Sequence, residues 1–433
     1  MPRVVRSAIL LGAGQRGRHV YGAYASRHPD RLRFVAVAEP DRQRRRVFSE
    51  EHAITPSHRF TDWEEMMDAQ LAPICVIATP DRHHVAPAIA ALERGLHVLL
   101  EKPAAHTLQD CSLVLEAARL SPGTLTIGHV LRYTPFFRTL NRLIGSGRLG
   151  RLVTIEHRED VAYWHMAHSF VRGNWGRAAS STPMIVQKCC HDFDILAWNL
   201  ATAPDPGRVT KLHSFGSLLH FRPENAPEGA ASRCTAPCPA AAACPFDARR
   251  LYLNPDLTGW PVHAITDDLT PEGRILALRE GPYGRCVYRS GSDVVDHQTV
   301  TMQTSTGATA ALLMNGHASY QARTARYHGT RGSVLATFGA DSRIEFTDHL
   351  GGATERIPVP TPGRGHGGGD TGLIESFLNS LDTPTPTQTS GETWYESHLL
   401  AFTAERARLA GETVDVDRIR STETSGRLPM TNS

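Results

Sequence analysis

The first third of the chain alternates short apolar runs with helix-like segments. The apolar runs cover residues 7–11, 32–38, 73–78 and 97–100, and residues 85–94 between the last two have helical character. Continuous apolar runs of this length are typical of parallel strands covered on both faces. Strands that alternate with helices build right-handed crossover units. The pattern therefore predicts an α/β fold with a doubly wound parallel sheet.

The chain is too long for this sheet to be its whole structure. With 433 residues, two domains are expected. We place a Rossmann domain at residues 1–130 and a second domain at residues 131–420. The second domain carries an insertion at about residues 221–282, rich in Pro and Ala, and a tail at residues 421–433 looks disordered. Residues 151–157 read as a strand, and residues 294–304 and 308–316 as a hairpin.

Charge and hydropathy exclude several classes of partner. Forty-six basic and 44 acidic residues leave a formal charge of +2, which argues against nucleic acid or an acidic membrane. No apolar run approaches the roughly 18 residues of a membrane span. The start, MPRVVRSAILLGAG, has too short an apolar run for a signal peptide. We expect a cytoplasmic protein.

The first apolar run is followed by GAGQRG, which places Gly12, Gly14 and Gly17 in a G-x-G-x-x-G pattern around Gln15 and Arg16. Between a strand and a helix, such glycines allow a pyrophosphate to approach helix amides. The second run ends in Glu39, where an acid can meet the ribose hydroxyls and repel a 2′-phosphate. NAD is therefore favoured over NADP, although Arg42, Arg44, Arg45 and Arg46 form either a solvent-exposed helix face or a phosphate site.

Polar residues follow the next two strands at the same edge of the sheet. Thr79, Pro80 and His84 come after the third strand, and Glu101 and Lys102 come after the fourth, before Pro103. Ligands bind at the carboxyl ends of the strands in such sheets. These residues are thus candidate cofactor contacts, and the alternative for Glu101 and Lys102 is a surface ion pair before a turn.

These motifs, in this order, resemble the Gfo/Idh/MocA oxidoreductases. The resemblance rests on GAGQRG, the Glu after the second strand, TPDRHHVAPAIAALERGLHVLLEKP and GHVLRYTPFFRTLNRLIGSGRLGRLVTIEH, and is strong over residues 7–200. It implies a second α/β domain with a large, mostly antiparallel sheet, whose open face pairs subunits as a homodimer or homotetramer. It also implies oxidation or reduction of a sugar or cyclitol hydroxyl, with Lys102 beside the nicotinamide and a cis peptide bond before Pro103.

The resemblance places a second catalytic element at PMIVQKCCHDFD, where His191 matches the family histidine. Relatives often have an acid four residues earlier, but this chain has Gln187, followed by Lys188. Both are candidate substrate contacts, and Gln187 can hydrogen-bond a hydroxyl but cannot take its proton. A helix beginning near His191 would point it into the cleft between domains. Arg132 and Tyr133 remain as substrate contacts in a segment where Val130 and Leu131 depart from the family pattern.

Two features of the second half have open interpretations. Cys234, Cys238 and Cys244 in the insertion either hold a structural zinc, with a fourth ligand from Cys189, Cys190 or Cys286, or are reduced thiols beneath a loop. Few large apolar residues surround them, so we expect no independent core there. In GRGHGGGD, His366 either contacts a substrate hydroxyl or belongs to a flexible loop in which Asp370 caps the next helix.

The expected reaction follows from these positions. His191 takes the proton of a sugar, cyclitol or glycoside hydroxyl, Lys102 stabilises the developing alkoxide, and Lys188 lowers the pKa of His191 if it reaches the site. One alternative is an NAD-dependent glycosidase that works by oxidation and elimination with retained NAD. Another is a cofactor-binding regulator without chemistry.

Overall fold

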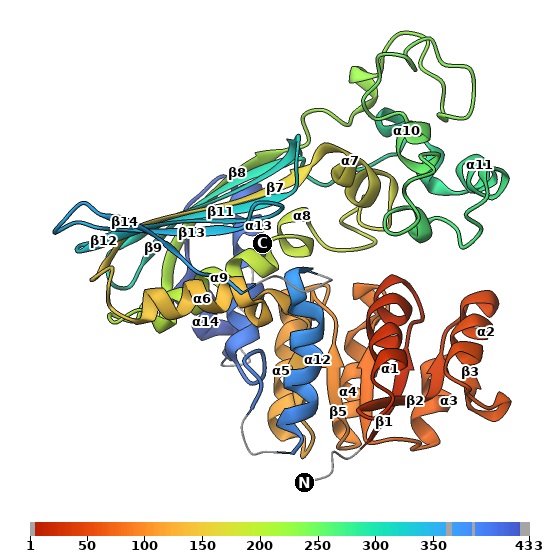
Figure 1. Cartoon of the computed structure of the whole chain (residues 1–433), viewed down its shortest axis with the longest axis horizontal. Coiled ribbons are helices and arrows are strands. Elements are labelled where there is room, and N and C mark those ends of the chain that lie inside the picture. The colour runs from red at the N-terminus through yellow and green to blue at the C-terminus, as the bar shows by residue number, and fades with distance from the viewer. Residues whose placement is uncertain (1–4, 361–365, 383–385, 425–433) are drawn as a thin grey trace, which may run out of the picture.

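Two β-sheets organise the chain, one in each half (Figure 1). The computed structural model describes residues 5–360, 366–382 and 386–424. The largest apolar cluster contains both Ile9 of the first sheet and Val300 of the second. The two halves are therefore packed together through shared buried side chains.

The first sheet is parallel throughout, as the apolar runs predict. In spatial order its strands are β3 (Arg59–Phe60), β2 (Leu32–Ala38), β1 (Arg6–Leu11), β4 (Ile74–Ile77), β5 (His97–Leu100) and β6 (Leu125–Ile127). The order reverses beside β1, where the neighbours are β2 and β4. This is the crevice in which doubly wound sheets bind their ligands.

Helices connect these strands on both faces of the sheet. They are α1 (Ala23–Arg27), α2 (Arg42–Glu51), α3 (Trp63–Asp68), α4 (Val85–Glu93) and α5 (Leu108–Leu120), and a π-helical turn (Gly17–Gly22) precedes α1. The peptide bond between Lys102 and Pro103 is cis, as the resemblance implies. The predicted doubly wound α/β sheet is confirmed.

The second sheet has nine strands and is mostly antiparallel, which confirms the fold class. Its order is β14 (Thr354–Ile357), β13 (Arg343–Asp348), β12 (Gly332–Phe338), β11 (Ala322–Gly329), β7 (Leu152–Ala162), β10 (Thr309–Ala318), β9 (His297–Thr304), β8 (Val209–Ser217) and β15 (Val414–Asp415). Within it, β7 and β10 run parallel. The predicted hairpin is β9 and β10.

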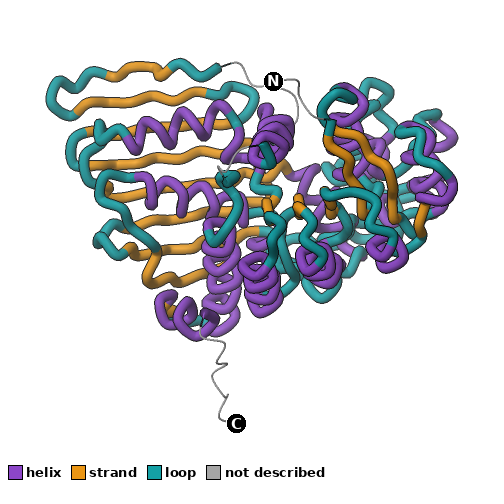
Figure 2. The backbone as a smooth tube through the Cα atoms, turned by 90° about the horizontal axis from the view of Figure 1, so that it is seen from below, coloured by secondary structure: helices purple, strands orange, loops and turns teal. Residues whose placement is uncertain are grey.

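Helices lie along one side of this sheet (Figures 1 and 2). They include α6 (Pro135–Gly145), α9 (Cys190–Thr202), α13 (Thr393–Ala410) and α14 (Val416–Thr424). The second domain also contains the short helices α7 (Tyr163–His165) and α8 (Met184–Gln187). Because α14 includes Ser421 and Thr422, the tail expected from residue 421 is helical at its start. Residues 425–433 lie outside the described residues. No helix within the described part of the chain is long and apolar enough to cross a bilayer.

The insertion projects beyond the end of the second sheet and contains α10 (Ala248–Tyr252) and α11 (Pro271–Glu280) (Figure 1). The buried side chains of Ala248, Tyr252, Val262 and Leu278 pack together as a separate cluster. The expectation that this segment has no core of its own is therefore wrong, since small and aromatic side chains from distant turns combine.

Helix α12 (Gly369–Ser380) crosses the predicted domain boundary. Its buried Leu373, Ile374 and Phe377 pack in the same apolar cluster as Ala8 and Leu10 of β1. The first domain thus includes a helix from the far end of the chain, and residues 1–130 alone do not complete it.

Candidate active site

The glycine motif forms a tight loop between β1 and the π-helical turn. Gly12 has a φ of 84°, and a Cβ added there would lie 2.8 Å from the carbonyl oxygen of Ala78. A Cβ on Gly17 would lie 1.9 Å from the oxygen of Gly12, whereas one on Gly14 would meet nothing within 4 Å. The buried side-chain oxygen of Gln15 has no hydrogen-bond partner. The loop is thus closed on its protein side and open at Gly14, where a pyrophosphate could approach the backbone closely.

Glu39 lies beside this loop at the end of β2. Its carboxylate accepts hydrogen bonds from the backbone N–H of Ala13 (2.8 Å) and of Asp41 (3.0 Å). The carboxylate is therefore held at the position where a ribose diol is bound in such folds. Of the arginines that follow, Arg42, Arg44 and Arg46 are exposed, while Arg45 donates to the carbonyl oxygens of Glu39 and Pro40.

Arg16 forms ion pairs with two carboxylates. Its Nε lies 2.6 Å from Glu101, and its Nη1 lies 2.9 Å from Asp370 of α12. The hydroxyl of Tyr21 donates to the same oxygen of Glu101 at 2.7 Å. Burial alone would raise the pKa of Glu101, but Arg16, Tyr21 and Lys102 lower it below its usual value. Arg16 therefore joins the glycine loop to α12 and keeps Glu101 ionised.

His84 connects the ends of β4 and β5. Its ring nitrogens lie 2.8 Å from the carbonyl oxygen of Pro103 and 2.9 Å from that of Thr79. The side chain of Thr79 in turn donates to the carbonyl oxygen of His83. Burial lowers the pKa of His84, although the two carbonyls oppose that shift. His84 and Thr79 thus shape the loop that borders the cofactor crevice, with Pro80 at its bend, and hold the turn after Lys102.

The half-buried side chain of Lys102 places its ammonium group at this edge of the sheet. Its Nζ donates to the carbonyl oxygen of Gln187 at 3.0 Å and lies 5.3 Å from the centre of the Trp175 ring. Burial lowers the pKa of Lys102, while Cys190 and Glu101 oppose the shift. One of the three N–H groups is used by the protein, so the remaining donors can serve a ligand.

His191 is buried on the first turn of α9. Its pKa is well below the ordinary value because of burial first and the positive charge of Lys102 second. Its ring lies 5.6 Å from that of His129 and 6.4 Å from that of His366, centre to centre. Its Nδ1 is buried without a hydrogen-bond partner. The structure therefore brings Lys102 and His191 into one buried polar region.

Gln187, which departs from the family pattern, and Lys188 beside it make different contacts. The side-chain amide of Gln187 donates to the buried carboxylate of Asp81, which joins the two domains. Lys188 lies 3.2 Å from Glu159, a fully buried acid that also pairs with Arg323 at 2.8 Å. Lys188 also lowers the pKa of Lys102, so it lies near the site while its own charge is paired.

Arg132 and Tyr133 have packing roles. Arg132 makes two hydrogen bonds to Asp194, at 2.7 and 2.6 Å, and a third to the carbonyl oxygen of Gln388. The hydroxyl of Tyr133 pairs with Thr389 at 2.9 Å. Both side chains are buried. These hydrogen bonds hold α9 and the segment before α13 against the Arg132–Tyr133 turn. We therefore do not retain Arg132 and Tyr133 as candidate substrate contacts.

The glycine-histidine segment reaches the site from α12. The Nδ1 of His366 lies 3.1 Å from Asp370, and its side chain is 46% exposed. Asp370 does not cap the helix, because the N-cap is Gly368 and the carboxylate pairs with Arg16 and His366 instead. Gly363 and Gly365 lie outside the described residues. His366 thus borders His191 on a partly open side.

Sequence reasoning missed several side chains that surround Lys102 and His191. Trp175, His129, Asp81, Glu159 and Arg323 all contact or perturb the candidate catalytic pair or its neighbours. They come from different parts of the chain, so no local spacing marks them. Only Asp81 had a signal, since it lies in the segment after β4.

Zinc at the insertion is not supported. No group of three or more His, Cys, Asp or Glu side chains among the described residues is arranged to hold a metal ion. Cys189 and Cys190 are fully buried beside α9. The prediction that one zinc ion is held by Cys234, Cys238 and Cys244 is therefore corrected.

Comparison with known proteins identifies the family. Residues 6–129 match the Gfo/Idh/MocA model, described as an oxidoreductase family with an NAD-binding Rossmann fold. A putative oxidoreductase of Bacillus subtilis, YteT, is 27% identical over 346 residues, which cover 77% of this chain and 78% of that protein. Over residues 6–129 the chain is thus a Rossmann domain of the Gfo/Idh/MocA oxidoreductase type. The similarity to that family and to YteT supports an NAD-binding oxidoreductase.

Other relatives match over less of their length or only in fold. An inositol 2-dehydrogenase of Corynebacterium glutamicum is 25% identical over 46% of this chain and 57% of that protein. A levoglucosan dehydrogenase solved with NADH and L-sorbose superposes with a TM-score of 0.68 at 18% identity, covering 96% of this chain and all of the other. An Agrobacterium radiobacter oxidoreductase solved with NAD+, L-tartaric acid and magnesium also gives 0.68, at 14% identity, covering 96% of this chain and 99% of the other. At these identities the solved structures show the shared fold.

Proposed function

We propose that this enzyme transfers a hydride between NAD and a hydroxyl-bearing carbon of a sugar, cyclitol or glycoside. Bound NAD would lie along the glycine loop and Glu39 and supply the hydride acceptor. The observation that carries the proposal is the shared burial of the Lys102 ammonium and the His191 imidazole, with the charge of one lowering the pKa of the other.

His191 suits the role of general base. Because its pKa is lowered well below the ordinary value, the imidazole is neutral near pH 7 and can accept a proton. Its Nδ1 has no protein partner. A neutral ring whose nitrogens are not both occupied can bind a substrate hydroxyl and take its proton as the carbonyl forms.

Lys102 suits the stabilisation of negative charge on the substrate oxygen. Its ammonium is positioned by the Gln187 carbonyl and the face of Trp175, and Glu101 beside it stays ionised. A cation fixed in a buried site stabilises a developing alkoxide without having to reorganise. The preference for NAD over NADP rests on the Glu39 carboxylate, which would repel a 2′-phosphate.

The substrate class rests on the relatives. Inositol 2-dehydrogenase and levoglucosan dehydrogenase are named for a cyclitol and an anhydrosugar. Both names describe dehydrogenases, which favours net hydride transfer over the glycosidase alternative. The partly exposed His366 beside His191 offers an imidazole for a further hydroxyl of such a polyol.

A substrate screen tests the proposal. The purified enzyme is incubated with NAD and a panel of aldoses, inositols and anhydrosugars, and NADH formation is followed together with any cleaved product. We expect NADH in proportion to oxidised sugar. Glycoside cleavage without net NADH would contradict the proposal.

Variants of the two catalytic candidates sharpen this test. Lys102→Ala and His191→Asn should each lower kcat by about 10²- to 10⁴-fold, because each removes a proton-transfer or charge-stabilising group. NAD binding, measured by fluorescence titration, should change little. Lys211→Ala, which removes an exposed lysine on β8, is the matched control. Near-normal turnover in Lys102→Ala would exclude the assigned role.

A further inference from the structure

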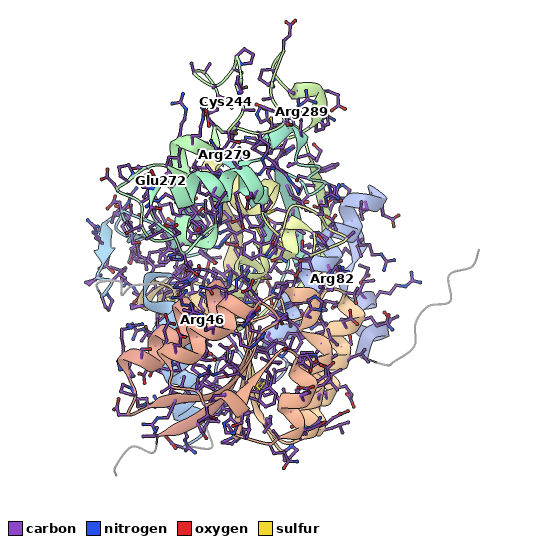
Figure 3. All side chains as sticks on the ribbon, turned by 90° about the vertical axis from the view of Figure 1, so that its right-hand side faces the viewer. Arg46, Arg82, Cys244, Glu272, Arg279 and Arg289 are labelled. Atoms are coloured by element: carbon purple, nitrogen blue, oxygen red, sulfur yellow. The ribbon has the colours of Figure 1, made fainter. Side chains whose placement is uncertain are left out.

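A second buried histidine lies beside the two catalytic candidates. His129 follows β6 at the edge of the first sheet that carries Lys102, and its side chain is fully buried, whereas Arg82 after β4 is exposed at the surface (Figure 3). The ring of His129 lies 5.6 Å from that of His191, centre to centre, with the two planes inclined at 75°. Burial first, and then the charge of Lys102 among others, lowers the pKa of both imidazoles. Both rings are therefore neutral near pH 7.

Ser397 of α13 determines which nitrogen of His129 carries the hydrogen. The hydroxyl of Ser397 donates its single hydrogen to the carbonyl oxygen of Trp394 at 2.7 Å. Its oxygen also lies 3.1 Å from the Nε2 of His129, so the oxygen accepts and Nε2 donates. The Nδ1 of His129 is therefore an unprotonated acceptor, and among the described residues this buried nitrogen has no hydrogen-bond partner.

His398, next to Ser397 on α13, supports this orientation. Its Nε2 accepts the backbone N–H of Ala104 at 2.9 Å, and burial lowers its pKa to about 3, so the neutral ring carries its hydrogen on Nδ1. That Nδ1 lies 3.0 Å from the carbonyl oxygen of Trp394 and 3.2 Å from the hydroxyl oxygen of Ser397. The Ser397 oxygen thus faces ring N–H groups of two histidines, which directs its own hydrogen to Trp394.

His191 has the complementary requirement. Its Nδ1 is buried and has no partner in the described part of the chain, while Nε2 is not among the buried unpartnered atoms and is left for a substrate. A neutral imidazole that accepts a proton on Nε2 carries its hydrogen on Nδ1. A buried N–H without an acceptor is unfavourable. His191 therefore needs an acceptor on its inner side, where the adjacent ring of His129 has an acceptor without a donor.

We propose that His129 is a positioning residue that holds His191 in the tautomer with its hydrogen on Nδ1. The inference rests on the proposed function, in which His191 is the general base. The ring centres are 5.6 Å apart and no direct hydrogen bond joins the two described rings, so one water molecule links the two Nδ1 atoms. The water accepts from His191 and donates to His129. The Nε2 of His191 is then unprotonated and can take the proton of the substrate hydroxyl.

Heteronuclear NMR of the full chain, produced with isotope-labelled histidine, reads this tautomer without any substrate. The ring signals of His191 are assigned by their loss in His191→Asn, and the nitrogen chemical shifts show which nitrogen carries the hydrogen at neutral pH. We expect Nδ1–H in the wild type and a shift towards Nε2–H in His129→Phe, which keeps a ring but removes the acceptor. A wild-type His191 with its hydrogen on Nε2, or a tautomer unchanged in His129→Phe, would overturn the proposal.

Ser397→Ala gives the same test with both rings in place. This substitution removes the acceptor that fixes the hydrogen of His129 on Nε2, so part of the His191 population should shift to Nε2–H. The tautomer can therefore be tested even if His129→Phe does not fold. His97→Phe, at the amino end of β5 and thus at the opposite edge of the first sheet, is the matched control and should leave His191 unchanged.

Kinetics separate a positioning role from a structural one. A catalytic histidine in the wrong tautomer is a poor base, so His129→Phe should lower kcat by about 10²- to 10⁴-fold while KM for NAD changes little. His129→Gln, whose side-chain oxygen can accept the same hydrogen bond, should recover part of this loss. Equal losses in both variants would contradict the proposal. If the wild type oxidises no sugar, the proposed function fails, whereas the NMR tautomer still decides the role of His129.

Discussion

At the scale of single residues, the charge of Lys102 adds to burial in disfavouring the protonated form of His191. Burial and Lys102 both lower the pKa of His191 below its ordinary value of 6.5. The imidazole of His191 is therefore neutral above pH 6.5. For hydroxyl oxidation, the fall of kcat/KM on the acid side of its pH profile (the acidic limb) should lie below pH 6.5. Replacing Lys102 by Met removes a positive charge that disfavours the imidazolium, so the pKa of His191 should rise and the limb should move towards higher pH.

This shift is measured from pH profiles of kcat/KM for the wild type and Lys102→Met, with ring-proton NMR of His191 as an activity-independent readout. Lys211→Met should leave both unchanged, because Lys211 is exposed on the second sheet. A limb that stays in place, or moves to lower pH, in Lys102→Met would show that the two groups are not coupled.

The buried pair of Arg132 and Asp194 is expected to contribute to stability more than to chemistry. Both side chains are at most 4% exposed, and two hydrogen bonds join them. Asp194→Asn leaves the Arg132 charge buried without a counter-ion and should lower the free energy of unfolding by about 3 to 5 kcal/mol. Urea denaturation measures this loss.

The matched control for this pair is Glu50→Gln, which breaks the exposed pair with Arg46 on α2. Such an i,i+4 pair contributes only about 0.3 to 0.5 kcal/mol. Equal effects of the two substitutions would show that the Arg132–Asp194 pair does not stabilise the fold.

At the scale of elements, the parallel strands of the first sheet could be predicted from the sequence, whereas the contacts between distant segments could not. β2, β4 and β5 are continuous apolar runs because both faces of the first sheet are covered, and that pattern is visible locally. Glu39, Lys102 and Glu101 could be placed because each directly follows such a strand. Asp370 and Arg16 are in contact although they are 354 positions apart in the sequence, so no local pattern predicts this ion pair.

The insertion also contacts the first domain through an element that no motif predicted. The ring of His263 stacks on His19 with centres 4.3 Å apart, and Asp267 lies 3.0 Å from Arg18. Arg18 and His19 directly follow the glycine loop, so the insertion supports the turn that would bind the pyrophosphate.

Removing the stacked ring should therefore weaken NAD binding. An aromatic pair contributes about 0.5 to 1.5 kcal/mol, so His263→Ala should raise the Kd for NAD by roughly 2- to 10-fold. Isothermal titration calorimetry measures the change. Glu272→Ala, a substitution at an exposed residue on α11 of the same insertion, should leave the Kd unchanged. An unchanged Kd in His263→Ala would show that the insertion does not contribute to NAD binding.

At the scale of the whole molecule, helices α6, α9 and α14 cover only one face of the second sheet. In Figure 1, α6, α9 and α14 lie below this sheet, and its upper face is turned away from them. Along β8, the side chains of Leu212 and Ser214 are buried, while that of Phe215 on the same strand is 68% exposed. On β10, Leu313 alternates with the buried Leu312 and Met314 and stays partly exposed. Apolar side chains on a broad sheet face mark a surface that associates.

We therefore expect a homo-oligomer that pairs through this face. Light scattering after gel filtration should give a mass that is a multiple of the 47.4 kDa chain. Phe215→Glu places a charge on this face, where burial without a partner would be costly, and should shift the protein towards the monomer. Leu276→Glu, at a residue of α11 that is 51% exposed, is the matched control and should leave the mass unchanged. If the wild type is a monomer, or if Phe215→Glu leaves the mass of the oligomer unchanged, this face of the nine-stranded sheet is exposed to solvent.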